Sequence, residues 1–513
     1  MFQACNTWRL KTCCCRKSNP VSELSKTEAL ISVAPASLPA ETGAILRILG
    51  RNTFWLWIDL GALRIGTMLA GLFLIRYLGP TNFGVYSTAL AAGWIANSVV
   101  DIGLTRYAAR AVAATREEAR PILALNLSTT AISCATEVII LLVALRLGHW
   151  QIACLAAGFV LCNLEGTASL CSSILTAELR SRAILPGSVL GAGSLVILTA
   201  IVIWLHLSVL TMLIALCFKS FFVLTLRLWQ LRQHWPTLDH YRWSAFCRVA
   251  RDAFPFFSYN LTQVGYGKVA ILCFGLVAPP EQVGWFAAAF VLSDVIPQWS
   301  YASSGALLPV WTRLFENGRV EEMVSLRQRL LDILLFASIP VWLSLALFAP
   351  EVCALLGSRY VASAPVLRIV ACRSVLAVLD GFLGHGFLVA VNRLKERQVA
   401  LSLSLVLLAA LSTLFGYLWG AVGVAIGLFI SDSTLILQYL WITSRIGMQI
   451  EWPSVAPSFF AGAIMVIWAL AIPQQIPLPL KLSTAFLAYL IALMLLSRDR
   501  LMGAGRTLQE CIR

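Results

Sequence analysis

Residues 76–89 read RYLGPTNFGVYSTA and join the end of one long apolar run to the start of the next. Pro80 cannot continue a helix, Gly79 frees the backbone, and a residue that precedes proline is pushed out of helical geometry. The stretch therefore predicts a tight turn between two helices.

The same pattern returns 200 residues further along the chain. The segment FGVYSTA at 83–89, which contains Gly84 and Tyr86, aligns with VGWFAAA at 283–289, which contains Gly284, and prolines lie just upstream of both. A match at so long a period indicates a duplicated unit of several helices.

The composition is that of a membrane protein. Hydrophobic residues make up 59% of the chain and charged residues 12%, whereas soluble domains carry about 25% charged residues. The net charge of +14 is spread between the apolar runs without a dense Lys/Arg block, which excludes a nucleic-acid partner. We predict an all-α, polytopic membrane protein.

Fourteen apolar segments are of the length that crosses a bilayer. Their approximate bounds are 53–76, 83–105, 121–146, 150–174, 184–206, 208–230, 254–277, 283–311, 329–356, 361–390, 398–418, 420–444, 454–472 and 481–497. The two copies of the turn precede the second and the eighth segments, as expected if six spans are duplicated and two are appended.

Most of the 39 Lys and Arg residues fall in the two tails and in the connectors that lie on the same side of the membrane as the tails. Arg227, Arg327 and Arg397 are among them. Such a bias places both termini in the cytoplasm. The predicted organisation is a flexible tail (1–50), an N-lobe of six spans (51–232), a basic connector (233–253), a C-lobe of six spans (254–446), two further spans (447–500) and a C-terminal tail (501–513). In the first tail, Cys13–Cys15 form either an incidental reduced cluster or a lipidation or redox site.

Three carboxylates inside apolar spans are candidates for ion coupling: Asp59, Glu137 and Glu165. A carboxylate inside an apolar span costs free energy if it is exposed to lipid, so it is expected to face a partner or a water-filled cavity. There it can bind a proton or sodium reversibly. The alternative for each is a neutral, hydrogen-bonded structural acid.

Five cations in apolar surroundings are candidates for a substrate cavity: Arg64, Lys219, Lys268, Arg368 and Arg373. Phosphate groups cannot enter a low-dielectric interior unpaired, so a cavity that holds them needs such cations. The alternative is a set of salt bridges within the bundle, with Asp294, Asp380 or Asp432 as partners.

The chain contains no Walker A loop, no HExxH and no Gly-x-Ser-x-Gly, so we expect neither an enzyme nor a cofactor or metal site. Glycines at 416, 420, 423 and 427 form small-xxx-small patterns that predict close helix packing.

Several stretches together resemble the polysaccharide flippase branch of the multidrug/oligosaccharidyl-lipid/polysaccharide exporter superfamily. The matching segments are RYLGPTNFGVYSTAL followed by DIGL at 101–104, the copy at 283–289, LGSRYVASAPVLR at 356–368, VAVNRLK at 389–395 and GAVGVAIG at 420–427. The chain departs from the family pattern at Gly267, where members often carry an acid.

The resemblance implies two six-helix lobes around a central cavity, in the bacterial inner membrane. It implies alternating access that moves an undecaprenyl-diphosphate-linked oligosaccharide to the outer leaflet for surface polysaccharide biosynthesis. The implied partners are this lipid-linked substrate, membrane lipids, a polysaccharide polymerase and glycosyltransferases.

Three other functions stay open at this point. A peptidoglycan-precursor flippase and a drug/cation antiporter belong to the same superfamily, although the antiporter would favour acidic over basic cavity groups. A membrane glycosyltransferase or polymerase is a different class, and it usually needs a larger outer loop than any in this sequence.

Overall fold

The computed structural model describes residues 40–237, 241, 243–473 and 476–512. Contacts divide the chain into one unit that ends at Arg51 and a second, much larger unit that comprises residues 52–513. The Cys13–Cys15 cluster and most of the predicted N-terminal tail lie outside the described residues. Helix α2, however, begins at Ala40, inside the segment predicted as a flexible tail.

All regular elements of the described residues are helices, which confirms the predicted fold class. The first seven helices in chain order are α2 (Ala40–Asp101), α3 (Leu104–Ala114), η1 (Arg116–Glu118), α4 (Ala119–Arg146), α5 (Trp150–Ala177), α6 (Ser181–Trp204) and α7 (Val209–Gln230). The next seven are η2 (Arg232–His234), α8 (Trp243–Val277), α9 (Pro280–Ser293), α10 (Val295–Glu316), α11 (Val320–Leu347), α12 (Ala349–Leu356) and η4 (Ser358–Ser363). The last six are α13 (Ala364–Leu379), η5 (Asp380–Phe387), α14 (Leu388–Ala390), α15 (Leu394–Arg445), α16 (Trp452–Ala471) and α17 (Leu478–Ile512).

Two of the long helices are each broken at a glycine. In α2 the break is at Gly79, where φ is 68° and ψ is 173°, and in α15 it is at Gly420, where φ is 63° and ψ is −143°. The positive φ at Gly79 is unfavourable for residues with a Cβ, and Pro80 follows it, so the predicted turn between two helices is confirmed.

By length and composition, nine helices of the described chain qualify as membrane spans, with each broken helix counted once. The chain is thus a polytopic membrane protein. The number of fourteen spans stays a prediction.

Other helix bounds differ from the predicted ones. The predicted segment 283–311 is two helices, α9 and α10, which meet at Asp294. The segment 329–356 likewise divides into α11 and α12, because Pro350 occupies the first turn of a new helix, where its missing N–H is harmless. Helix α17 continues through the predicted C-terminal tail to Ile512, since residues 498–512 contain no proline and many strong helix formers.

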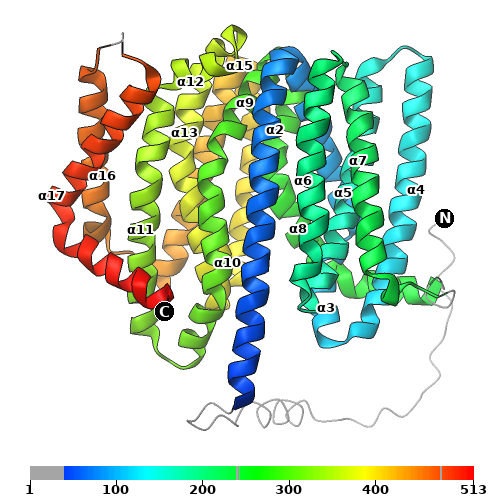
Figure 1. The fold of residues 1–513 in the computed structure, drawn as a ribbon, viewed down its shortest axis with the longest axis horizontal. Helices are drawn as coiled ribbons and strands as arrows, with labels where there is room; N and C mark the ends of the chain where they lie inside the picture. Colours follow the sequence, from blue (N-terminus) through cyan, green and yellow to red (C-terminus); the bar gives the residue numbers. More distant parts are fainter. Residues whose placement is uncertain (1–39, 238–240, 242, 474–475, 513) are drawn as a thin grey trace. The chain divides into compact units, whose positions relative to one another are not determined.

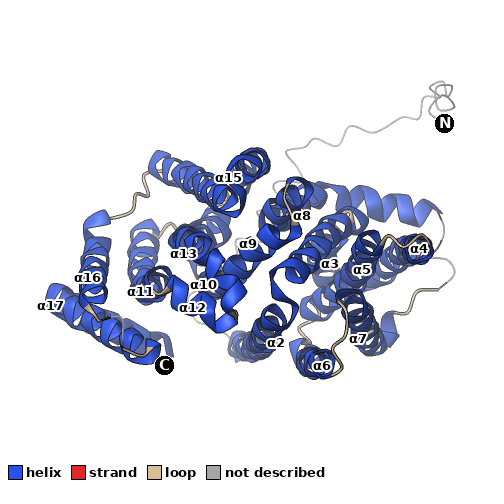
Figure 2. Ribbon diagram, turned by 90° about the horizontal axis from the view of Figure 1, so that it is seen from above, coloured by secondary structure: helices blue, strands red, loops and turns tan. Residues whose placement is uncertain are grey.

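The helices of residues 52–513 form two packed groups (Figure 1). In the N-terminal group, which we define as α2 to α7, α5 packs against α3, α4, α6 and α7. In the C-terminal group, α8 to α15, helix α13 packs against α9, α10, α11 and α15. Helices α16 and α17 pack on each other and on α11, and α8 contacts both α15 and the N-terminal helices α3 and α4 (Figure 2).

The predicted close packing of the two arms of α15 is confirmed. A Cβ at position 423 would collide with the carbonyl oxygen of Phe415, and one at 427 would lie 3.0 Å from the Cβ of Leu411. Only glycine permits this approach of the two arms.

Candidate functional site

The two copies of the repeated turn lie against each other in the structure. A Cβ at Gly84 would collide with the carbonyl oxygen of Pro280, and a Cβ at Gly284 would collide with the carbonyl oxygen of Pro80. The contact is therefore reciprocal: each glycine receives the backbone of the other copy. We call this region the hairpin end.

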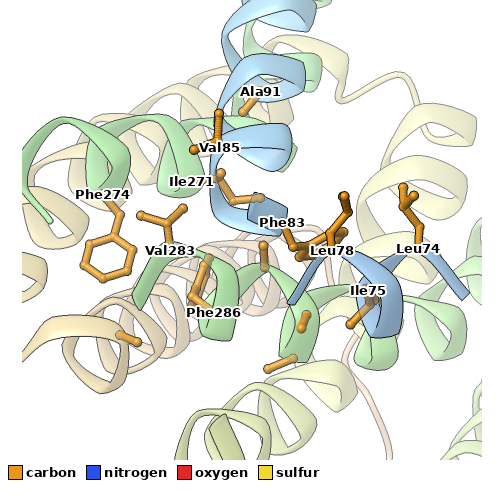
Figure 3. Packing of buried hydrophobic residues seen from close by; sticks show 14 of the residues in the cluster. Leu74, Ile75, Leu78, Phe83, Val85, Ala91, Ile271, Phe274, Val283 and Phe286 are labelled. Atoms are coloured by element: carbon orange, nitrogen blue, oxygen red, sulfur yellow. The ribbon is translucent and has the colours of Figure 1, made fainter. Parts of the chain in front are cut away.

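Apolar side chains from both helix groups surround this contact. Figure 3 shows Ile75 and Phe83 of the two α2 arms near Ile271 of α8 and Val283 and Phe286 of α9, all of them buried. One hydrogen bond crosses the cluster, from the Tyr360 hydroxyl to the Ile75 carbonyl at 2.9 Å. The hairpin end is thus an apolar, closely packed seal.

The part of α2 that follows the break at Gly79, residues 80–101, ends in a polar region at Asp101. The Asp101 carboxylate accepts hydrogen bonds from the backbone N–H of Thr105, at 3.2 Å, and from its hydroxyl, at 2.6 Å. These bonds cap the start of α3, where Gly103 has φ of 82° and no side-chain cap of its own. The other Asp101 oxygen accepts from the Asn260 amide of α8 at 3.1 Å, which links the two helix groups. We call this region the Asp101 end.

Gly103 lets α8 approach closely at this end. A Cβ at position 103 would lie 2.6 Å from the backbone nitrogen of Phe257 and 2.8 Å from the carbonyl carbon of Phe256. The DIGL segment at 101–104 therefore supplies both the acid and the space for a contact between the two groups.

Between the two ends, Glu137 lies in a buried polar network inside the N-terminal group. Its Oε1 accepts from the Asn163 amide at 2.7 Å and from the Ser133 hydroxyl at 2.9 Å, and Asn97 donates to Asn163 at 3.1 Å. Glu137 is 6% exposed, and its Oε2 has no hydrogen-bond partner within the described part of the chain. The carboxylate is held by neutral donors alone.

Glu165 and Lys219 form an ion pair of 3.0 Å between α5 and α7. Ser220 also donates to Glu165, and the Glu165 side chain remains 35% exposed. Half-buried Lys268 of α8 lies within electrostatic range of Cys162, one helix turn from Glu165. The structure thus brings together two of the predicted cavity cations and one of the predicted coupling acids.

Asp59 lies in a different place, with Ser188 of α6 and Arg227 of α7. Arg227 donates to the Ile184 carbonyl at 2.6 Å and to the Ser188 hydroxyl at 2.8 Å. It lies close enough to Asp59 for an electrostatic interaction, and Asp59 is buried. This arrangement ties the first arm of α2 to α6 and α7, away from Glu137 and Glu165.

In the C-terminal group, Arg373 donates to Asp432 at 2.5 Å. The Tyr266 hydroxyl of α8 donates to the other Asp432 oxygen at 2.6 Å, and the Arg373 guanidinium also lies 5.3 Å from the centre of the Phe290 ring. Both charged side chains are almost fully buried. The salt-bridge alternative therefore holds for Arg373.

Two of the five predicted cations remain, Arg368 and Arg64. Arg368 is exposed on α13, and Cys372, one turn later on the same face, is exposed as well. The side chain of Arg64 lies outside the described part of the structure. The five predicted cations are therefore distributed over both helix groups, and three of them are near a specific acid or thiol.

Several polar residues of these networks were missed by the sequence reasoning. Asn97 and Asn163 could have been recognised from the sequence, because a side-chain amide inside an apolar run needs a hydrogen-bond partner. Arg227, Arg327 and Arg397 were counted as connector charges, which was wrong. All three are buried, and Arg327 donates to the carbonyls of Met448 and Gln449 at 2.8 and 2.5 Å.

A hollow of about 470 Å³ lies beside the hairpin end, where α15 breaks at Gly420. Its described lining includes Gln282, Trp285, Tyr417 and Trp419 but no charged side chain. Exposed tryptophan and tyrosine are typical of the membrane interface. Among the residues that the structure describes, no three His, Cys, Asp or Glu side chains are grouped as a metal site.

Long apolar helices in two groups, with ionisable side chains buried between their ends, define a polytopic membrane protein. Residues 49–315 match the family of polysaccharide biosynthesis proteins, and the chain belongs to that family. No curated protein matches the sequence at a significant level.

Solved structures share the fold. The lipid II flippase MurJ in an inward closed conformation aligns with a TM-score of 0.70 at 12% identity, over 86% of this chain and 99% of that chain. An inward-facing multidrug resistance MATE family transporter of the MOP superfamily aligns with a TM-score of 0.54 at 16% identity, over 76% of this chain and 98% of that chain. The resemblance inferred from the sequence motifs is thereby confirmed at the level of family and fold.

Proposed function

We propose that the protein is a flippase that moves an undecaprenyl-diphosphate-linked oligosaccharide to the outer leaflet of the bacterial inner membrane, for surface polysaccharide biosynthesis. Both termini lie in the cytoplasm. The moving parts are the N-lobe (51–232) and the C-lobe (254–446), joined by the basic connector. The hairpin end then faces outward and the Asp101 end faces the cytoplasm.

One observation carries this proposal. The two helix groups meet at an apolar seal at one end and at a set of polar contacts at the other, and buried or partly buried ionisable groups lie between the two ends. Closing one end while the other opens is the arrangement that alternating access requires. The family match supports polysaccharide biosynthesis as the pathway.

The basic side chains between the two ends support an anionic lipid substrate. A diphosphate needs cationic partners in a low-dielectric path, and Arg368 is an exposed guanidinium on the central helix α13. Lys219 and Lys268 add positive charge near Glu165. The cavity of a drug/cation antiporter would instead carry more acidic than basic side chains. A polysaccharide polymerase and glycosyltransferases would act on the same lipid-linked substrate.

Carboxylates provide the route for ion coupling. Glu137 is held by neutral donors, and Glu165 is partly exposed beside Lys219. Glu137 has no cation among its hydrogen-bond donors for a proton or sodium to displace, whereas Glu165 is already paired with Lys219. Asp59, next to Arg227, is the weaker of the three coupling candidates.

Deletion of the gene tests the proposal. The expected result is loss of a surface polysaccharide and accumulation of lipid-linked repeat units on the cytoplasmic side. Complementation with Arg64→Ala, Lys268→Ala and Arg368→Ala is expected to fail for at least one variant that inserts normally. Arg313→Ala, which changes an exposed arginine in the last turn of α10, is the matched control and is expected to restore the polysaccharide.

Normal polysaccharide after deletion would contradict the proposal, as would intermediates that already face outward. If cell-wall precursors accumulated instead, the substrate would be the peptidoglycan precursor.

A further inference from the structure

The element η5, residues Asp380–Phe387, is a π-helix. Its sequence, DGFLGHGF, carries three glycines, and α10 packs against two of them. The Ser300 hydroxyl donates to the Val378 carbonyl at 2.6 Å and the Ser304 hydroxyl donates to the Gly381 carbonyl at 2.6 Å. Serines of the neighbouring helix thus satisfy carbonyls in and next to the irregular turn. π-helical turns occur frequently at functional sites, and this one carries Asp380 and His385.

Asp380 and His385 lie close together inside the C-terminal group. The Tyr301 hydroxyl donates to Asp380 Oδ2 at 2.8 Å, and His385 Nδ1 lies 3.8 Å from the same oxygen. The imidazole also meets the Tyr301 ring edge-on, with 4.7 Å between the ring centres. Asp380 is 8% exposed. The buried acid and the half-buried imidazole, whose side chain is 21% exposed, therefore lie side by side.

Arg397 of α15 determines the protonation state of His385. Its guanidinium is fully buried and lies 3.1 Å from His385 Nε2. Arginine can only donate hydrogen bonds, so Nε2 must accept, and the ring is neutral with its proton on Nδ1. Nδ1 is the ring nitrogen on the Asp380 side, at 3.8 Å from Oδ2, which is longer than a hydrogen bond.

The same guanidinium holds one turn of α8. Arg397 donates to the Tyr259 hydroxyl at 3.2 Å and to Gln263 Oε1 at 3.0 Å. From the N-terminal group, the Arg106 guanidinium lies 5.4 Å from the centre of the same Tyr259 ring, and the next residue, Asn260, binds Asp101. The turn of α8 that Arg397 holds is therefore the turn that closes the Asp101 end.

We propose that His385 is a proton-binding site that controls the Asp101 end. A proton taken up at Nε2 converts this nitrogen from acceptor to donor, so the bond from Arg397 is lost and two cations face each other. Asp380 stabilises the imidazolium, while Arg397 withdraws and releases Tyr259 and Gln263. The contact between Asn260 and Asp101 then opens. This inference rests on the proposed function, for which it supplies the link between a proton and the movement of the two groups.

The surroundings of His385 supply charges of both signs. The titratable and charged side chains nearest to it from the packed elements are Asp380, Asp294, Tyr301, Arg373, Arg397, Asp432, Tyr439, Tyr259, Tyr266 and Arg106. Asp432 is occupied by Arg373 and Tyr266, so Asp380 is the acid that faces the imidazole.

A distance measurement across the Asp101 end tests the proposal without substrate. Spin labels are attached at Ala109 of α3 and Ser258 of α8, both exposed, in the full-length protein after its native cysteines have been replaced. The distance between the two labels is then measured in lipid vesicles. The guanidinium of Arg397 beside Nε2 opposes the uptake of a second positive charge, so the pH is lowered from about 8 to about 4, below the range in which an unperturbed histidine takes up a proton, and we expect a longer-distance population to grow. His385→Gln, which keeps an acceptor for Arg397 but cannot become an imidazolium, is expected to lose this response.

His234→Gln is the matched control. His234 is buried and lies 2.6 Å from Glu178, but it belongs to η2, the short helix that follows α7, and no hydrogen bond among the described residues joins it to His385 or Arg397. This variant is expected to keep the response to pH. Arg397→Gln is the second test, and it is expected to show the long distance at both pH values, because α8 has lost its tether.

Three results would overturn the proposal: a distance that does not change with pH in the unaltered protein, an unchanged response in His385→Gln, or a closed Asp101 end in Arg397→Gln. Because no substrate is present, these outcomes are independent of whether deletion of the gene abolishes a polysaccharide. A pH response in a protein that exports no oligosaccharide would leave the switch intact and remove only the proposed substrate.

Discussion

The hairpin end and the Asp101 end bring the same two helix groups together, but by different physical means. At the hairpin end, Gly84 and Gly284 each receive the backbone of the other copy, and the surrounding side chains are apolar. At the Asp101 end, Gly103 allows a similar backbone approach, but the contact also depends on Asp101, Asn260 and two arginines around one tyrosine ring.

The difference indicates which end responds to a chemical signal. A packed apolar contact has no group that a proton or an ion can alter. A contact made of charged and hydrogen-bonded groups can exchange its partners for water and can be shifted by a change of one proton. We therefore expect the Asp101 end to be the regulated end and the hairpin end to follow it.

The largest effect is expected from filling the glycines of the hairpin end. In Gly84→Leu or Gly284→Leu the new side chain meets backbone of the other copy, which cannot move out of the way. Overpacking typically costs about 1–3 kcal/mol and occasionally more, and a collision with backbone belongs at or above the top of that range, so we expect loss of surface polysaccharide in a complementation assay. Gly71→Leu, on the same α2 helix but with nothing within 4 Å, is expected to export normally. Equal export by Gly84→Leu and Gly71→Leu would show that the seal is unimportant.

A somewhat smaller effect is expected at the other end from Asp101→Ala. The change removes the cap of α3 and the bond to Asn260 together, at about 1.5–3 kcal/mol for hydrogen bonds to a charged group. The distance between labels at Ala109 and Ser258 is expected to lengthen even near neutral pH. Asp252→Asn, which alters an exposed acid on α8, serves as the control. A short distance in Asp101→Ala would contradict the assigned role of this carboxylate.

Two variants of Glu137, which lies between the two ends, distinguish a structural role of this carboxylate from a role in binding a proton. Glu137→Leu leaves the Asn163 amide and the Ser133 hydroxyl without their acceptor, so thermal unfolding in detergent is expected to show a loss of about 1–3 kcal/mol. Glu137→Gln keeps an acceptor oxygen and is expected to unfold near the temperature of the unaltered protein. If both variants were equally unstable, the negative charge itself would be needed by the fold, and reversible proton binding at Glu137 would be excluded.

The smallest effect is expected from Tyr360→Phe at the hairpin end. It removes one buried hydrogen bond, to the Ile75 carbonyl, and keeps the ring in the apolar cluster. The expected cost is about 0.5–1.5 kcal/mol, seen as a slightly lower unfolding temperature with an unchanged response to pH. The control is Tyr417→Phe on the exposed face of α15. An altered pH response in Tyr360→Phe would mean that the two ends are not separable.

Much of the fold follows from simple features of the sequence. Apolar runs of bilayer length predict the helices, Gly79 with Pro80 predicts the break in α2, and spaced glycines predict the close arms of α15. The internal bounds of the C-terminal helices were harder to predict. The π-helix at Asp380 depends on serines of α10 that satisfy its carbonyls, and that partnership exists only in the folded chain.

The site was predictable only in part. The sequence points to ionisable residues inside spans, but it does not pair them, because the rotation of each helix is set by tertiary packing. Thus Lys219 and Arg373 look alike in sequence, yet one lies beside a partly exposed acid and the other is fully occupied by Asp432. Arg397 falls at the boundary of a connector and a span, where hydropathy indicates exposure, although its side chain is fully buried.

Accessibility of Cys372 is the most direct test of a path between the two groups that opens at the Asp101 end. This native thiol is exposed on α13 one turn from Arg368, and the full-length protein with Cys372 as its sole cysteine can be treated with a membrane-impermeant maleimide in oriented vesicles. The account predicts labelling from the cytoplasmic side that becomes faster in Asp101→Ala, and little labelling from the outer side. Reaction only with lipid-soluble reagents would place this face of α13 in the bilayer and would contradict the account.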